Sequence, residues 1–322
     1  TISKTLPLSC GVPQGSILGP LLFIIYINDI TNVSKLFDLI MFADDTNLFI
    51  KDKNLGSLVA NANNELDKIS NWFKLNKLSL NIKKTNFILF TSRKRKLDEK
   101  PELKIDGTKI EQVRTAKFLG VVINDTLTWD DHIKTVKQKV QKNIGIIYRI
   151  RANLPSCTAL SLYFTLIHPY FEYCNIVWAV HRSSQLNKLF ICQKIAIRTI
   201  TNSRRRTHTK PLFAKLKILT LFDVNNQQVA CFMYRSTNNL LPDYFSKMFS
   251  QNSSFHAHNT RQHHHIHIIR HRLNVRRNTV HIFGPKLWNN LPTAITQSPN
   301  VFVFKRRYKN YLLLNPTFIN LF

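Results

Sequence analysis

The sequence predicts an α+β fold, in which a small antiparallel sheet with packed helices precedes a longer, mostly helical and basic part. Two apolar runs flank a short polar break within residues 37–50, which is typical of two antiparallel strands joined by a tight turn. Residues 57–75 repeat apolar side chains at three- and four-residue steps, the period of an amphipathic helix. Residues 133–322 hold 28 Lys and Arg against 3 Asp and Glu, and helical patterns follow one another there.

The composition excludes a disordered chain. Of the 322 residues, 44% are apolar and 11% are aromatic, which is ample for two or three domains with packed cores. The five cysteines are odd in number and form no C-x-x-C pair, a pattern that indicates reduced, intracellular thiols. We therefore expect the protein to be intracellular, in the nucleus or the cytoplasm, and not secreted.

The one candidate membrane span is too short. Only residues 17–27 are continuously apolar, Gly19-Pro20 interrupts them, and a bilayer crossing needs about 20 apolar residues. The opening segment also lacks the basic region and cleavage site of a signal peptide. We therefore expect no membrane partner.

Asp44 and Asp45 are adjacent at the break between the two predicted strands. Neighbouring carboxylates repel each other and need a cation, a basic partner or water to stay ionised. Mg²⁺ takes oxygen ligands and typically binds one or two protein carboxylates together with substrate phosphates. The pair therefore predicts a divalent-metal site of the polymerase type, and a solvated turn is the plain alternative for two aspartates between strands.

A loop rich in Gly and Pro precedes the hairpin. Residues 11–15 place two glycines and a proline around Gln14, so the backbone there can approach a ligand closely. Pro20 suits the start of a helix that runs to about Asn28. Such a junction presents unpaired backbone N–H groups to an anion, and a purely structural turn is the alternative.

Further short elements are predicted after the hairpin. The helix of residues 57–75 should pack beneath the sheet. Residues 78–90 are expected to form a turn followed by a strand, and Asp106-Gly107 predicts a type I′ hairpin between short strands. Residues 118–121 are expected to open another apolar strand.

The second half of the sequence predicts basic helices. Residues 128–131 resemble a capping box, with acids in the first turn of a helix that extends to about Arg151. Residues 158–173 and 186–201 are expected to form further helices. The net charge is +3 for residues 1–132 and +25 for the remainder, so a polyanion is the expected partner. No amphipathic anchor or lipidation motif is present, and nucleic acid is favoured over a membrane.

Histidines gather near the C-terminal end. Seven of them lie between His256 and His271, which would suit zinc, but no cysteine lies among them and the spacing matches no zinc-finger pattern. A basic, partly solvated tail is the favoured interpretation.

Two sequence motifs together resemble those of reverse transcriptases. CGVPQGSILGPLL, from Cys10 to Leu22, and FADD, from Phe42 to Asp45, stand in the order and near the spacing of that family. The chain resembles the non-LTR retrotransposon class, of the jockey-like or CR1-like kind. Residues 258–262 and 283–288 also resemble the C-terminal end of such reading frames. The resemblance is specific up to Asp45 and looser afterwards.

The resemblance implies a role for each motif. Asp44 is the main ligand of two Mg²⁺ ions, with Mn²⁺ as a substitute, and Asp45 is a lesser ligand. Lys84, with Lys83 adjacent, matches the lysine that would protonate the departing pyrophosphate, and a solvated lysine pair in a polar turn is the alternative. The incoming nucleotide and the template contact Pro13, Gln14 and Gly15, with Ser16 at the edge. The primer grip, which positions the primer 3′ end, comprises Phe118, Leu119 and Gly120.

The resemblance also implies the domain organisation and the reaction. Residues 1–126 correspond to the C-terminal part of a polymerase palm, 127–249 to a helical thumb or connection, and 250–322 to a basic His-rich region. The reaction is addition of deoxynucleoside triphosphates to a DNA primer on an RNA template.

The chain is expected to be the C-terminal fragment of a longer polyprotein, because the first residue is Thr1 and only ten residues precede the GVPQG motif. The upstream motif that carries another metal-binding aspartate has no counterpart in the sequence, so the isolated fragment is expected to be inactive. A non-catalytic nucleic-acid-binding remnant of such an element is the alternative function.

Overall fold

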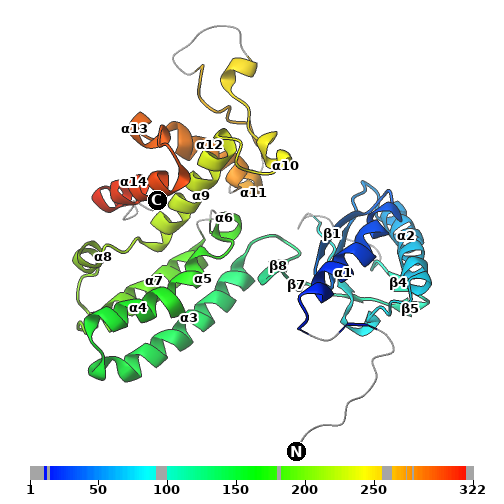
Figure 1. Ribbon diagram of the computed structural model, residues 1–322, viewed down its shortest axis with the longest axis horizontal. Helices are drawn as coiled ribbons and strands as arrows, with labels where there is room; N and C mark the ends of the chain where they lie inside the picture. Colours follow the sequence, from blue (N-terminus) through cyan, green and yellow to red (C-terminus); the bar gives the residue numbers. More distant parts are fainter. Residues whose placement is uncertain are drawn as a thin grey trace, which may run out of the picture. The chain divides into compact units, whose positions relative to one another are not determined.

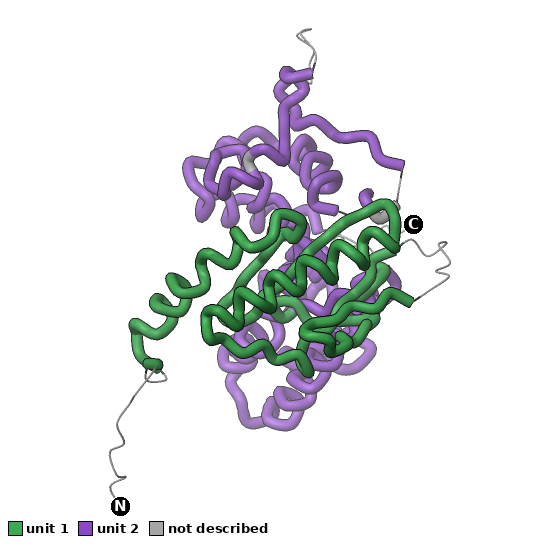
Figure 2. Tube along the Cα trace, turned by 90° about the vertical axis from the view of Figure 1, so that its right-hand side faces the viewer, with its two compact units in different colours: residues 1–120, 124–126 green, residues 121–123, 127–322 purple. Residues whose placement is uncertain are grey.

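The computed structural model describes residues 11–12, 15–91, 100–179, 183–255, 263–272, 274–277 and 279–316. The chain divides into two compact units, coloured separately in Figure 2. Unit 1 comprises residues 1–120 and 124–126, and unit 2 comprises residues 121–123 and 127–322. Helices and small two-stranded sheets make up the described elements, so the predicted α+β class is confirmed (Figure 1).

The predicted hairpin is present in unit 1. Strand β1 (Asp38–Phe42) pairs antiparallel with β2 (Asp45–Phe49), and Phe42 lies opposite Asp45. A two-residue turn of Ala43 and Asp44 joins the strands, with Ala43 in the left-handed region at φ 52°. One face of the hairpin packs Leu39, Met41 and Leu48 against the core, and the other face is exposed.

Helix α2 (Leu55–Leu75) packs against this core, as predicted. The side chain of Asn54 caps the helix by accepting hydrogen bonds from the backbone N–H groups of Gly56 and Ser57. Its buried apolar stripe recurs at helical spacing, and the strand side chains complete the core on the other side. The stripe consists of Ala62, Leu66, Ile69 and Phe73.

The remaining elements of unit 1 are short. They are α1 (Leu18–Ile27), η1 (Asn28–Asn32), η2 (Ile82–Lys84), β3 (Asn86–Phe87), β4 (Lys104–Ile105), β5 (Thr108–Lys109), β6 (Glu111–Gln112) and β7 (Thr115–Phe118). Strand β3 runs parallel to β6, and β4 pairs antiparallel with β5. The strand expected within residues 78–90 is therefore only two residues long.

The predicted turn at Asp106-Gly107 is confirmed. Both residues have positive φ, 50° and 72°, as a type I′ turn requires. The Asp106 carboxylate accepts hydrogen bonds from Lys74 and Ser70 of α2, and these bonds lower its pKa below the ordinary value. These bonds attach the turn between β4 and β5 to α2, the helix that also packs in one core with the β1–β2 hairpin.

The apolar strand expected to open at residues 118–121 begins only at the last of them, Val121. Phe118 ends β7, and Leu119 and Gly120 form the turn before β8 (Val121–Asn124). Leu119 has φ 43° and Gly120 has φ 82°, a left-handed pair that continues no strand. The apolar character of the segment conceals this turn in the sequence.

In unit 2, helix α9 (Leu221–Thr237) is buried along most of its length and contacts α5, α6, α12 and α14 (Figure 1). A second core lies where α3 and α7 pack together with α4. The described helices of unit 2 are α3 (Asp130–Ile150), η3 (Arg151–Asn153), α4 (Ser156–Leu166), α5 (His168–Glu172), α6 (Asn175–Trp178), α7 (Ser184–Ile200), α8 (Lys210–Leu216), α9, α10 (Asp243–Ser246), η4 (Asn252–Ser254), α11 (Asn274–Arg277), α12 (Val280–Asn289), α13 (Thr293–Thr296) and α14 (Val301–Leu314).

The basic helix expected after residue 127 is confirmed as α3, with Asp130 and Asp131 in its first turn. Its N-cap residue is Trp129, in a left-handed conformation, and that residue makes no side-chain capping bond. The helices expected over residues 158–173 and 186–201 are also confirmed, the first of them divided into α4 and α5.

The sequence predicts a basic, partly solvated tail at the C-terminal end. The structure contradicts this prediction, because the C-terminal region contains packed helices. Helices α12 and α14 pack against α9, and Phe304, Tyr308 and Leu312 of α14 are buried in the shared core. Gly284 of α12 allows this approach, because a Cβ there would lie 2.5 Å from the Sδ atom of the buried Met233.

Within the described part of the chain, none of the helices combines the length and apolar character that a membrane crossing requires.

We predict opposite effects for alanine at two helical glycines of unit 2. Gly284→Ala should destabilise the protein by about 1–3 kcal/mol, because the new methyl group overpacks the α9–α12 contact. Gly145→Ala, in the interior of α3, should stabilise it by up to about 1 kcal/mol, since a Cβ there meets no atom within 4 Å. Urea unfolding of both variants measures the difference, and a gain in stability for Gly284→Ala would contradict the packing described.

His132 of α3 is a buried histidine that stays neutral. Burial, followed by the nearby charge of Lys139, lowers the pKa of His132 to about 4. Its Nδ1 accepts a hydrogen bond of 3.2 Å from the backbone N–H of Val122, and its ring lies against Trp178 at 5.3 Å. Protonation would abolish this acceptor, so the neutral ring is part of the folded structure.

We predict that unit 2 loses stability as the pH falls. The unfolded state takes up a proton near pH 6.5 and the folded state near pH 4, so the contribution of His132 is present above about pH 6.5 and is lost between these values. The loss amounts to at most about 3 kcal/mol. His132→Asn, which keeps an acceptor near the Nδ1 position, should flatten the pH profile of the unfolding free energy. An unchanged profile in this variant would contradict the assignment.

Candidate active site

The two candidate metal ligands lie at the end of the β1–β2 hairpin. Asp44 is in the turn and Asp45 is the first residue of β2, and both side chains are exposed. Neither carboxylate forms an ion pair with a basic side chain among the described residues. Both are therefore available to a cation from solution.

The turn determines which of the two carboxylates lies on the exposed face of the hairpin. Because Asp45 lies directly opposite Phe42, it shares the exposed face of Phe42 and Ile40, and Asp44 belongs to neither strand. Asp44 would share that face only if β1 were regular through residue 44, and the left-handed Ala43 ends the strand before it.

The face that carries Asp45 is apolar and exposed. Ile40, Phe42 and Phe49 are 47%, 63% and 41% exposed, respectively. Phe49 follows Asp45 at a spacing of four in a regular strand, so both point to the same side. The sequence interpretation missed Phe49, although the period of two residues along β2 gives that signal.

Phe118 is brought to this face. Its ring lies perpendicular to that of Phe49, with ring centroids 6.3 Å apart. A residue of the candidate primer grip thus contacts the strand that begins with Asp45. Leu119 and Gly120 follow in the turn, and their assignment to a primer grip stays a prediction.

The candidate nucleotide-binding loop is described only in part. Pro13 and Gln14 lie outside the described residues. Gly15 has φ 86° and open space where a Cβ would lie, and Ser16 Oγ accepts a hydrogen bond of 3.0 Å from the backbone N–H of Gly19. This bond ties Ser16 to the first turn of α1, which starts at Leu18, as the motif predicts to within two residues.

Helix α1 exposes most of its apolar side chains. Its only buried residue is Ile27, and Phe23 packs partly against the core. The exposed apolar side chains of the helix are Leu18, Leu21, Leu22, Ile24, Ile25 and Tyr26. Among the described residues, nothing covers this surface.

Lys84 ends the short helix η2. The Asn81 side chain accepts a hydrogen bond from the backbone N–H of Lys84, which fixes the turn. The Lys84 side chain is exposed and forms no ion pair within the described residues. No described contact brings it to Asp44 or Asp45, so its catalytic role stays a prediction.

The described residues contain no group of three or more His, Cys, Asp or Glu side chains that could hold a metal ion. This applies to the His-rich segment as well, of which His256 and His258 lie outside the described residues. Asp44 and Asp45 are thus two adjacent carboxylates, and the described residues gather no third His, Cys, Asp or Glu side chain beside them.

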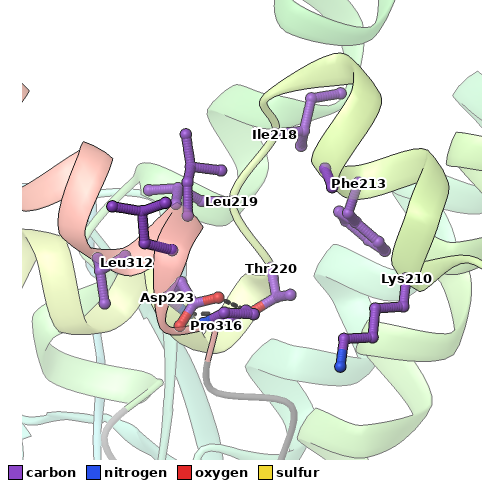
Figure 3. A pocket seen from close by; sticks show the side chains of 11 residues that line it. Lys210, Phe213, Ile218, Leu219, Thr220, Asp223, Leu312 and Pro316 are labelled. Atoms are coloured by element: carbon purple, nitrogen blue, oxygen red, sulfur yellow. Dashed lines mark hydrogen bonds between the residues drawn. The ribbon is translucent and has the colours of Figure 1, made fainter.

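A cavity of about 260 Å³ in unit 2 is a poor candidate for a site (Figure 3). Its walls are mainly apolar, from Phe213, Leu219 and Leu312. The one carboxylate in it, Asp223, accepts a hydrogen bond of 2.6 Å from the hydroxyl of Thr220, whose oxygen in turn accepts from the Asp223 backbone N–H. This is the capping arrangement of α9, so Asp223 has a structural function.

The part of the chain that contains the β1–β2 hairpin matches a known protein family. Residues 2–123 match the family model described as reverse transcriptase (RNA-dependent DNA polymerase). The chain is 26% identical over 233 residues to the probable RNA-directed DNA polymerase from transposon X-element of Drosophila melanogaster, covering 70% of this chain and 25% of that protein.

Two further relatives from Drosophila melanogaster are similar. The RNA-directed DNA polymerase from mobile element jockey is 26% identical over 231 residues, 69% of this chain and 25% of the relative. The probable RNA-directed DNA polymerase from transposon BS is 26% identical over 203 residues, 60% of this chain and 22% of the relative. The chain thus spans about a quarter of the length of these curated relatives. No solved structure matches it.

The family match covers the candidate nucleotide-binding loop, the β1–β2 hairpin and the turn after Phe118, and the similarity to the polymerases extends beyond them into unit 2. Residues 2–123 are therefore similar to reverse transcriptases, and the chain as a whole is similar to the RNA-directed DNA polymerases of transposon X-element and mobile element jockey.

Proposed function

We propose that this chain is part of an RNA-directed DNA polymerase that adds deoxynucleotides to a primer 3′-hydroxyl on an RNA template. The observation that carries the proposal is the β1–β2 hairpin, whose turn presents two unpaired, exposed carboxylates within the residues that match the reverse transcriptase family. Unit 2, which holds most of the excess positive charge, supplies a surface for the nucleic acid.

The carboxylate turn fits divalent metal ions. Asp44 and Asp45 supply hard oxygen ligands, and no described basic side chain neutralises them. When bound, two Mg²⁺ or Mn²⁺ ions would favour ionisation of the primer hydroxyl and stabilise the charge of the pyrophosphate. Asp44 would be the main ligand and Asp45 the lesser one, with the remaining ligand from outside the described residues.

The other candidate residues would position the substrates. The backbone of Pro13, Gln14 and Gly15 would hold the nucleotide and the template, with Ser16 at the edge of the loop. The exposed ammonium of Lys84 would donate a proton to the departing pyrophosphate. Phe118, packed against Phe49, would hold the primer near the face that carries Asp45.

The proposed enzyme contains more polypeptide than these residues. Helix α1 exposes six large apolar side chains, a surface that soluble proteins normally cover. The curated relatives are about four times as long as the region that matches. We propose that a preceding part of the same polyprotein packs on α1 and completes the site.

We also propose an intracellular location, in the nucleus or the cytoplasm. The four described cysteines are free thiols, as expected in a reducing compartment.

A non-catalytic nucleic-acid-binding protein is the second candidate function. The net charge of +25 over residues 133–322 supports either function, because phosphate binding requires no chemistry. Primer extension on an RNA template, by a longer protein that includes this chain, separates the two. Template-dependent incorporation supports the polymerase, and binding without incorporation supports the alternative.

We predict unequal losses for Asp44→Asn and Asp45→Asn in that longer protein. Asp44→Asn keeps the side-chain shape and removes one negative charge from the metal ligands, so nucleotide addition should slow by about a thousandfold or more. Asp45→Asn should slow it distinctly less. Single-turnover addition at saturating Mg²⁺ measures both rates.

Asp38→Asn is the matched control for these variants. Asp38 is an exposed aspartate on the same face of the hairpin, at the opposite end from Asp45, and its replacement removes the same charge. It should leave the rate within a few fold. A larger loss for Asp45→Asn than for Asp44→Asn would reverse the assignment of the main ligand.

A further inference from the structure

A groove of about 470 Å³ lies in unit 2 between residues 265–268 and helix α12. Asn289 of α12 holds the two sides together, because its Nδ2 donates to the carbonyl oxygen of Ile266 at 2.9 Å and its Oδ1 accepts from the Ile266 N–H at 3.0 Å. The Ile266 side chain is buried against Val229 and Met233 of α9. The groove is therefore a fixed feature of the fold.

The chemistry of the groove favours an anion. Lys286 and His265 line it together with the amide side chains of Asn252 and Asn290, and no carboxylate of the described residues does. The surrounding sequence strengthens this preference, since residues 244–322 contain eleven Lys and Arg and no Asp or Glu. A phosphate group is the anion that suits ammonium, imidazole and amide donors together.

An aromatic platform adjoins the groove. The imidazole of His267, which lines the groove, stacks on the ring of Phe255 with centroids 4.2 Å apart and an interplanar angle of 30°. The Nδ1 atom of His267 lies 3.1 Å from the Oδ1 atom of Asn252, which holds the imidazole in place. Phe255 is 54% exposed, so its ring is accessible to a further planar group.

We propose that this groove binds one nucleotide of single-stranded nucleic acid, with the phosphate near Lys286 and His265 and the base stacked on the Phe255–His267 pair. Positive side chains that follow the backbone and aromatic rings that stack on bases are the two elements of single-strand recognition. A base within a duplex is already stacked on its neighbours, so the aromatic pair discriminates in favour of an unpaired strand.

This inference deepens the proposed function, because it names the form of nucleic acid that the C-terminal region holds. It does not depend on catalysis, because binding of a single strand requires no chemistry. A binding measurement on residues 1–322 therefore tests it separately from the polymerase proposal.

The experiment compares Phe255→Leu with Phe302→Leu, a matched control on α14 whose side chain is 81% exposed. Fluorescence anisotropy measures the binding of each variant to a fluorescein-labelled oligouridylate and to a blunt RNA duplex. Phe255→Leu should weaken oligouridylate binding by about tenfold, the expected loss of one stacked base, and leave duplex binding unchanged. Phe302→Leu should change neither.

A second variant tests the phosphate contact. Lys286→Gln should weaken oligouridylate binding and make the slope of the log–log salt plot shallower by about one unit. Equal losses for the two Phe variants, or an equal loss on the duplex, would overturn the proposal. The proposal would also be overturned if an acidic peptide bound more tightly and displaced the oligouridylate while Phe255→Leu left oligouridylate binding unchanged. That result would assign the groove to a protein partner.

Discussion

The register of the β1–β2 hairpin is the constraint on which the candidate active site depends. With Phe42 opposite Asp45, Leu39 and Met41 reach the core beside α2, and Asp45 remains in solvent. A slip of one residue would exchange the two faces of β1, exposing Leu39 and Met41 and turning Asp38 toward the core. The same hydrophobic contacts that stabilise unit 1 therefore determine where both carboxylates lie.

Unit 2 depends on a different constraint, the burial of polar side chains around α9. Gln193 of α7 is fully buried, and its amide bonds to the Tyr163 hydroxyl, the Leu219 carbonyl and the Leu221 N–H. These bonds connect α4 and α7 to the segment that leads into α9. A buried amide with satisfied donors and acceptor specifies one arrangement of these elements more strictly than apolar packing alone.

Local signals allowed much of unit 1 to be predicted from sequence. The alternating apolar runs, the spacing of Leu66, Ile69 and Phe73, and the Asp106-Gly107 pair each determine structure within a few residues. The turn at Leu119 and Gly120 was missed because a left-handed backbone is uncommon for leucine, so its residue type does not signal a turn.

Contacts between distant segments could not be predicted in the same way. The contact of Phe118 with Phe49 joins segments that are far apart in sequence, and the motifs identified each residue without its neighbour. The C-terminal helices were missed for a related reason. Their basic composition suggested solvation, whereas Phe304 and Tyr308 supply a buried stripe that is only recognisable against α9.

We propose above that the turn of the β1–β2 hairpin binds divalent metal ions. The most direct test is a titration of isotopically labelled residues 1–322 with Mn²⁺, in which paramagnetic broadening of the backbone amide signals is measured. We expect the signals of Ala43, Asp44 and Asp45 to broaden first, and Asp44→Asn to abolish this effect. Broadening that begins at another exposed acid, such as Asp29 or Glu111, would contradict the claim.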